Sequence, residues 1–333
     1  MRDYYRYVVR LLAVVLLSAF VSCARAPQKV VVNGTAQGSF YEITYYDNDA
    51  RDFQHQFDSI FALIDASVSL WNENSVISKV NRNEEVELDK VFVDNFNIAQ
   101  EYAALSGGAF DPTVAPLVSM WGFSYKNDIE PTTENIDSLK QLVDYRKVRI
   151  EDGKVVKGDE RMKLDFNAIA QGYTTDLIAE FLHQQGIDIY LVNVGGEILA
   201  HGAKPDGSSW IVGIEKPAEN WDSEPVVQER VPLGDMGLVT SGSYRKYVER
   251  GGKRYSHTID PVTGCPVEHR LISATVMAET SVKADALASI CMVMGLEKSL
   301  ELINSLDGVE AFYIYADENG ELTTFATEGF KTL

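Results

Sequence analysis

Residues 163–202 constrain the fold of this chain more than any other segment. Alternating apolar residues predict a short strand at 162–166, and helical spacing predicts a helix from about 168 to 184, which Gly186 ends. Residues 187–194 are rich in β-branched side chains and predict a second strand. The segment is therefore expected to form a strand–helix–strand crossover, a unit that tends to carry ligands at the carboxyl ends of its strands.

The remaining elements are irregularly mixed. Strands are expected at 30–32, 40–46, 210–214, 311–315 and 322–326, and on both sides of a Gly251-Gly252 turn within 244–258. Helices are expected at 53–68, 93–105, 134–142, 282–294 and 296–306. Residues 217–232 are polar, acidic and contain proline, which predicts an exposed loop. Strands that alternate irregularly with helices indicate an α+β fold and argue against a doubly wound sheet.

Charge and composition exclude several classes of function. The 333 residues are 45% hydrophobic, which suffices for one large domain or two closely fused ones. With 30 basic against 49 acidic residues, the net charge is −19, so binding of nucleic acid through a basic face is not expected. An anionic ligand would need a cation or a group of backbone N–H donors. The sequence contains neither a dinucleotide-binding glycine motif, nor a P-loop, nor H-E-x-x-H, and three cysteines are too few for a disulfide scaffold.

The N-terminus is expected to be a targeting signal. Three arginines precede an apolar run at 11–21 that ends in Ser22 and Cys23, a pattern similar to the lipobox of bacterial lipoproteins. We expect a signal peptide at 1–22, lipidation of Cys23, a tether at 23–29 and one folded domain at 30–333. The predicted location is lipid-anchored and facing the periplasm, with the inner membrane favoured. The alternative is an ordinary signal peptide followed by an incidental cysteine.

Several short segments combine glycines with polar side chains. Asp111 lies between a Gly-Gly pair and Pro112, and either caps a helix or faces a ligand. Asp165 and Asn167 lie where a predicted strand meets a helix, and either cap that helix or help a phosphate bind there. His257 is the best candidate for a general base, because the usual pKa of histidine lies near neutrality.

Asp285 and Ser289 are spaced by four residues on the last long helix, so their oxygens project from the same face. Hard oxygen ligands of this kind suit Mg²⁺, with backbone carbonyls, water and substrate phosphates completing the coordination. The alternative is a structural pair, in which Asp285 favours the helix N-terminus and Ser289 bonds back to a carbonyl.

Taken in order, six segments resemble the ApbE family, the FAD:protein FMN transferases. They are residues 107–123 (GGAFDPTVAPLVSMWGF), 164–176 (LDFNAIAQGYTTD), 191–202, 239–244 (VTSGSY), 254–266 (RYSHTIDPVTGCP) and 284–289 (ADALAS), and the resemblance covers about 34–330. It implies an ApbE-like (T-fold-like) α+β fold of mixed sheets with flanking helices. It also implies Mg²⁺-dependent transfer of the FMN half of FAD to a threonine of a target flavoprotein, with release of AMP.

The resemblance also assigns residues. The implied FAD-binding positions are Gln37, Trp71, Ala109, Phe110, Asp111, Asp165, Gln171 and Ile259. The implied Mg²⁺ ligands are Asp285, Ser289 and the carbonyl of Ala168, and the implied catalytic residues are His257 and Asp260. Acceptors would be membrane redox proteins such as subunits of the Na⁺-translocating NADH:quinone reductase or of Rnf complexes.

One departure from the family pattern bears on the reaction. Gln171 stands where the family usually has lysine, which removes a positive contact to the ligand. Two alternatives follow from the same site: an Mg²⁺-dependent FAD pyrophosphatase that yields free FMN and AMP, and a lipoprotein that binds FAD without catalysis.

Overall fold

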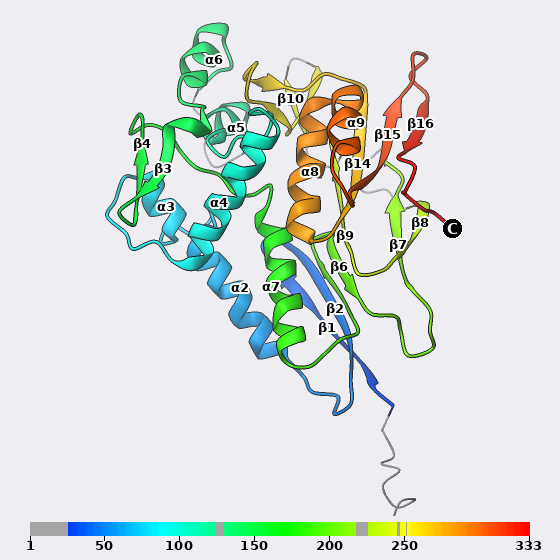
Figure 1. Ribbon diagram of the computed structural model, residues 1–333. Helices are drawn as coiled ribbons and strands as arrows, with labels where there is room; N and C mark the ends of the chain where they lie inside the picture. The colour runs from blue at the N-terminus through cyan, green and yellow to red at the C-terminus, as the bar shows by residue number, and fades with distance from the viewer. Residues whose placement is uncertain (1–25, 124–128, 218–225, 245–246, 251) are drawn as a thin grey trace, which may run out of the picture.

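An eight-stranded sheet forms the centre of the computed structural model, which describes residues 26–123, 129–217, 226–244, 247–250 and 252–333 (Figure 1). Every neighbouring pair of strands in it is antiparallel. In spatial order the strands are β1 (Gln28–Ala36), β2 (Ser39–Asp47), β5 (Tyr190–Val194), β6 (Glu197–His201), β9 (Gly237–Gly242), β14 (Leu271–Ala278), β15 (Glu310–Ala316) and β16 (Leu322–Ala326).

Three helices cover one face of this sheet: α2 (Gln54–Val68), α7 (Ala170–Gln184) and α8 (Ser281–Met294). The apolar stripes of α2 and α7 pack on β1, β2 and β5, and α8 packs on β9, β14 and β15. The hairpin β7 (Trp210–Glu215) and β8 (Val227–Leu233) covers part of the opposite face. Alternate residues of β9, β14 and β15 therefore enter different cores, as the period-2 geometry of a strand requires.

Smaller elements surround the end of the sheet where α7 begins (Figure 1). They are α3 (Val76–Asn81), α4 (Lys90–Leu105), α5 (Ala115–Trp121), α6 (Thr133–Lys140), the 3₁₀ helix Tyr145–Lys147, α9 (Leu296–Asn304), and the hairpins β3 (Val148–Glu151)–β4 (Lys154–Lys157), β10 (Tyr247–Arg250)–β11 (Lys253–Ser256) and β12 (Ile259–Asp260)–β13 (Cys265–Pro266). The expected α+β class is confirmed.

The expected strand–helix–strand crossover is wrong in one of its strands. Met162, Leu164 and Phe166 are buried, but residues 162–166 have no regular secondary structure and join no sheet. A side chain satisfies its backbone instead: Asn81 donates to the Leu164 carbonyl at 2.8 Å and accepts from the Leu164 N–H at 2.7 Å. Buried alternation without a neighbouring strand therefore produced a false strand prediction.

One further expectation is corrected, and one central strand was missed. The predicted loop at 217–232 contains β8 from Val227 onward, which pairs with β7. The central strand β14 was not predicted from the sequence. The expected signal peptide and Cys23 lie outside the described residues, and no described helix is long and apolar enough to cross a membrane.

Candidate functional site

The site is built around the first turn of α7. The extended segment that leads into it is held by Asn81 on one side and by a bond from the Asp165 N–H to the Pro112 carbonyl, at 2.8 Å, on the other. Phe166 and Ile169 are fully buried and anchor the turn in the core. The sequence positions expected to bind FAD at 109–111 and at 165 are therefore brought together by two segments that lie about fifty residues apart.

Gly172 allows α8 to approach α7 at this point. A Cβ on Gly172 would lie 2.7 Å from the Val282 Cα and 2.9 Å from both the Asp285 Cβ and the Ser281 carbonyl oxygen. Real Cβ atoms do not come this close to backbone atoms, so any larger residue would push the two helices apart. Figure 1 shows the result, with the N-terminal ends of α7 and α8 side by side.

The close approach supplies an acceptor for the first turn of α7. Gly172 is the third residue of α7, so its N–H has no acceptor within the helix. It donates instead to Asp285 Oδ2, at 3.1 Å. The Ala168 carbonyl, expected to be a metal ligand, lies before the N-cap residue Ile169, and no backbone bond within the described part of the chain takes it as an acceptor.

Asp285 is 5% exposed and lies in an acidic environment. Burial raises its pKa well above the usual range, the nearby carboxylates of Glu197 and Asp176 raise it further, and the bond from Gly172 opposes them. A buried carboxylate that faces other carboxylates needs a positive partner to stay ionised. Ser289 lies one turn further along α8 and is partly buried. A carboxylate, a hydroxyl and a backbone carbonyl form a donor set that fits Mg²⁺.

Gln37 and Gln171 both reach the first turns of α7. Gln37 lies in the β1–β2 turn with a φ of 51°, and its Nε2 donates to Thr174 Oγ1 at 2.7 Å. Its Oε1 is buried without a hydrogen-bond partner among the described residues. Gln171 packs over the β5–β6 turn, where a Cβ on Gly195 would collide with its Nε2 and lie 3.0 Å from Glu197 Oε2. The Gln171 amide therefore lies in the same acidic region as Asp285.

The Asp111 carboxylate is buried and organises its own loop. Oδ1 accepts from the Thr113 N–H at 2.8 Å and from its hydroxyl at 2.6 Å, and Oδ2 accepts from the Tyr145 N–H at 2.9 Å. Burial raises the pKa of Asp111 although these bonds lower it. Asp165 behaves similarly: burial raises its pKa, and a bond from the Asn167 N–H at 2.8 Å opposes the rise. Both aspartates therefore hold turns.

Ala109 and Phe110 complete the Gly-rich segment that follows α4. The Phe110 N–H donates to Ser106 Oγ at 3.0 Å, and the Phe110 ring is 7% exposed within the main core. Ala109 is partly buried. Packing of the Phe110 ring in the core leaves backbone and Ala109 as the groups of this segment that a ligand would meet.

The expected catalytic residues lie on a second group of elements beside α5. Ile259 packs on Leu117, Met120 and Trp121, and the Trp121 Nε1–H donates to the Gly264 carbonyl at 2.9 Å. Asp260 Oδ1 accepts from the Val262 N–H at 2.8 Å, so its carboxylate holds a turn. The His257 ring contacts the Phe123 ring, with centroids 6.3 Å apart. Because α5 follows directly after residues 111–114, it connects this group to the first turn of α7.

Trp71, expected to stack on flavin, is 61% exposed in the turn after α2. Its backbone N–H donates to Ser69 Oγ at 3.3 Å. The contacts described above do not bring it together with the other candidates. Its stacking role stays a prediction.

Sequence reasoning missed three residues at the junction of α7 and α8: Gly172, Asp176 and Glu197. Gly172 and Asp176 lie in segment 164–176 and Glu197 lies in segment 191–202, but none of the three was singled out. Helical spacing within one helix gives no signal for a contact between helices more than a hundred residues apart.

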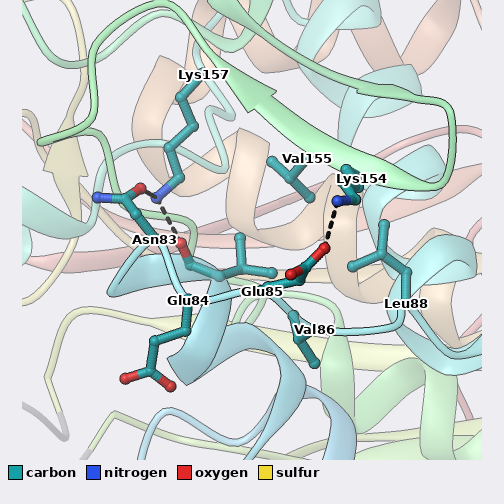
Figure 2. A pocket seen from close by; sticks show the side chains of 9 residues that line it. Asn83, Glu84, Glu85, Val86, Leu88, Lys154, Val155 and Lys157 are labelled. Atoms are coloured by element: carbon teal, nitrogen blue, oxygen red, sulfur yellow. Dashed lines mark hydrogen bonds and ion pairs between the residues drawn. The ribbon is translucent and has the colours of Figure 1, made fainter.

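A cavity of about 340 Å³ lies elsewhere, between the loop after α3 and the hairpin β3–β4 (Figure 2). Its lysines already have partners. Lys154 pairs with Glu85, and Lys157 donates to the Val80 carbonyl at 2.7 Å and to Asn83 Oδ1 at 2.9 Å. The cavity is lined by none of the candidate residues and gives no competing site.

Comparisons with known proteins identify the family of the whole chain. The profile of the ApbE family matches residues 37–313. The FAD:protein FMN transferases of Vibrio cholerae and Escherichia coli K12 are each 32% identical; the alignments cover 96% of this chain and 97% of the Vibrio protein, and 97% of this chain and 96% of the E. coli protein.

Two solved structures are similar along nearly their whole length. The flavin transferase ApbE from Vibrio cholerae superposes with a TM-score of 0.81 at 31% identity, covering 91% of this chain and 98% of that one. The apo flavinyl transferase ApbE of Pseudomonas stutzeri gives 0.80 at 33%, covering 91% and 96%. The order of the six motifs, the α+β sheet they surround and these matches together show that the chain belongs to the ApbE family.

Proposed function

We propose that this chain is an FAD:protein FMN transferase that uses Mg²⁺ to move the FMN half of FAD onto a threonine hydroxyl of a target protein. The observation that supports this most directly is the junction of α7 and α8, where the buried Asp285 carboxylate accepts from the Gly172 N–H and lies near the carboxylates of Glu197 and Asp176. Relatives with the same activity in their names cover nearly the whole chain.

In this reaction the threonine oxygen forms a bond to the phosphorus of the FMN half, and the bond from that phosphorus to the bridging oxygen of AMP breaks. The threonine proton must leave, and His257 is the candidate to accept it. Mg²⁺, when bound, would neutralise negative charge on the diphosphate. Asp285, Ser289 and the Ala168 carbonyl would hold the ion, and the bonds around Asp111 and Asp165 keep the surrounding turns rigid.

Incubation of the purified protein with FAD, Mg²⁺ and a threonine-containing acceptor protein tests the proposal. The expected result is flavin fluorescence that stays with the acceptor in a denaturing gel, together with the mass of one added FMN. Ser289→Ala should raise the Mg²⁺ concentration needed for half-maximal transfer, whereas Ser305→Ala, at an exposed hydroxyl beyond α9, should leave it unchanged. Absence of labelled acceptor with several acceptors, from folded protein that binds FAD, would exclude transferase activity.

Hydrolysis is the second candidate, and the position of Gln171 favours testing it. Its neutral amide lies beside Glu197, so this position supplies no positive charge. Chromatography of a reaction without acceptor distinguishes the two activities, because a pyrophosphatase releases FMN and AMP whereas a strict transferase leaves FAD intact. A lipoprotein that only binds FAD would leave it intact with acceptor present as well.

We further propose that Cys23 carries a lipid and that the domain faces the periplasm, with membrane redox proteins as acceptors. The basic, apolar and small-residue order of residues 1–23 supports this proposal. Mass spectrometry of the N-terminal peptide from membranes should show an acylated Cys23, and Cys23→Ser should release the protein from the membrane fraction. A soluble wild-type protein that starts at another residue would contradict it.

A further inference from the structure

The start of α8 donates two hydrogen bonds to a side chain of the neighbouring helix α7. Asp176, on the second turn of α7, accepts from the Ser281 N–H through Oδ1 at 2.8 Å and from the Val282 N–H through Oδ2 at 2.9 Å. The first N–H groups of a helix have no partner within the helix, and here a side chain 105 residues away supplies the acceptors for two of them.

The remaining N–H groups of that turn are satisfied locally. Thr280 accepts from the Lys283 N–H through its hydroxyl at 3.3 Å and from the Ala284 N–H through its carbonyl at 3.1 Å. Thr280 thus caps α8 like an ordinary N-cap residue. Asp176 adds what an N-cap residue does not, because it ties the beginning of α8 to α7.

This tie lies close to the candidate metal ligands. Val282 and Asp285 are on the side of α8 that touches Gly172, and Ser289 follows Asp285 by one turn. The two oxygens of Asp176 and the contact at Gly172 together determine how far α8 is shifted along α7. That shift sets the separation between the Asp285 carboxylate and the Ala168 carbonyl, since Ala168 lies only two residues before α7 begins.

We propose that Asp176 is a positioning residue for the metal site: by holding the first two N–H groups of α8, it fixes the position of Asp285 and Ser289 relative to the start of α7. The inference rests on the proposed function, because it concerns the Mg²⁺ that this function requires. Asp176 itself ligates neither the ion nor FAD.

The test compares Asp176→Ala, Asp176→Asn and the control Glu180→Ala in the full protein. Glu180 lies one turn beyond Asp176 on α7, is exposed, and bonds only to Gln184 of its own helix in the described contacts. Flavin fluorescence anisotropy gives FAD binding, first with a chelator and then with MgCl₂ titrated at fixed FAD. Hydrogen exchange of the peptide that spans 279–286 reports the state of the α8 terminus.

For Asp176→Ala we expect faster exchange in that peptide and an increase of about tenfold in the Mg²⁺ concentration that half-saturates FAD binding, the size typical for loss of a residue that orients metal ligands. FAD affinity with chelator should stay within about twofold of the wild type, and Glu180→Ala should change nothing. Asp176→Asn keeps one acceptor oxygen, so its Mg²⁺ shift should be smaller; this variant decides the question if the alanine variant does not fold.

Faster exchange with an unchanged Mg²⁺ requirement would overturn the inference and leave Asp176 a purely structural cap. An equal loss of FAD affinity with and without Mg²⁺ would overturn it too, since that pattern means general damage to the site. The wild-type titration separately tests the proposed function, which fails if Mg²⁺ has no effect on wild-type binding or turnover.

Discussion

Replacing Gly172 with alanine tests how closely α7 and α8 must approach. In an ordinary helix interior this change stabilises by roughly 1 kcal/mol, because glycine loses more backbone entropy on folding. At Gly172 the new Cβ would lie 2.7 Å from the Val282 Cα and 2.9 Å from the Ser281 carbonyl oxygen. Overpacking costs about 1–3 kcal/mol, and the cost lies at the upper end where backbone atoms must move. We therefore expect a net destabilisation of about 1–2 kcal/mol.

Urea denaturation monitored by tryptophan fluorescence measures this change. Gly234→Ala is the matched control, because a Cβ there meets no atom of the described residues within 4 Å and its φ is ordinary; its stability should stay equal or rise by about 0.4–1 kcal/mol. Gly172→Ala should also raise the Mg²⁺ requirement for FAD binding, since the Asp285 Cβ is among the atoms displaced. A Gly172→Ala protein as stable as the wild type would refute the argument that the two helix backbones are in contact.

Three further predictions follow from contacts of the described residues. Asp285→Ala should abolish flavin transfer and the rise in Tm that FAD with Mg²⁺ causes in the wild type. Its metal-free stability at neutral pH should stay within about 1 kcal/mol of the wild type, because the change removes a disfavoured buried carboxylate along with one hydrogen bond. A fully active variant at low Mg²⁺ would contradict the ligand assignment. Burial lowers the pKa of Lys157 to about 8, so the folded state binds fewer protons than the unfolded state between about pH 8 and 10.5. The free energy of unfolding should therefore rise across that window, by at most about 1–2 kcal/mol after allowance for solvent screening. Urea midpoints should show this rise, and Lys157→Met should remove it. Trp121→Phe deletes the 2.9 Å hydrogen bond to the Gly264 carbonyl and should lower the free energy of unfolding by about 1 kcal/mol. Hydrogen exchange should become faster over 259–266 but not over 170–184. Equal effects in both segments would contradict this prediction.

Periodicity in the sequence predicted most helices on the main sheet face. The apolar residues of 53–68 and 282–294 correspond to α2 and α8, each within one residue at its start. One side of α2 is buried, which gives helical spacing, whereas α8 is buried nearly all round and shows a continuous apolar run. Strand β14 was missed for the opposite reason. Six of its eight residues are buried, so Leu271–Ala278 shows no alternation, and its small and hydroxyl-bearing side chains resemble no standard strand pattern.

Within the site, what is local in the sequence could be predicted and what depends on packing could not. Asp285 and Ser289 were found from their spacing on one helix. The hydrogen bond from the Gly172 N–H to Asp285 depends on the approach of α8, which lies more than a hundred residues away in the sequence. The two hydrogen bonds from the start of α8 to the Asp176 carboxylate are likewise contacts between helices, and neither segment indicates them when read alone.

Asn81 has a consequence for how position 81 can vary. Its amide presents a donor and an acceptor side by side to Leu164, which is the arrangement that one rung of an antiparallel ladder would offer. Aspartate would set a carboxylate oxygen against the Leu164 carbonyl, and leucine would leave both backbone groups without partners in a buried place. Only an amide of this length offers both partners at once. One side chain therefore satisfies the backbone groups of Leu164 that a neighbouring strand would otherwise satisfy, and the chain enters α7 without adding a strand to the sheet.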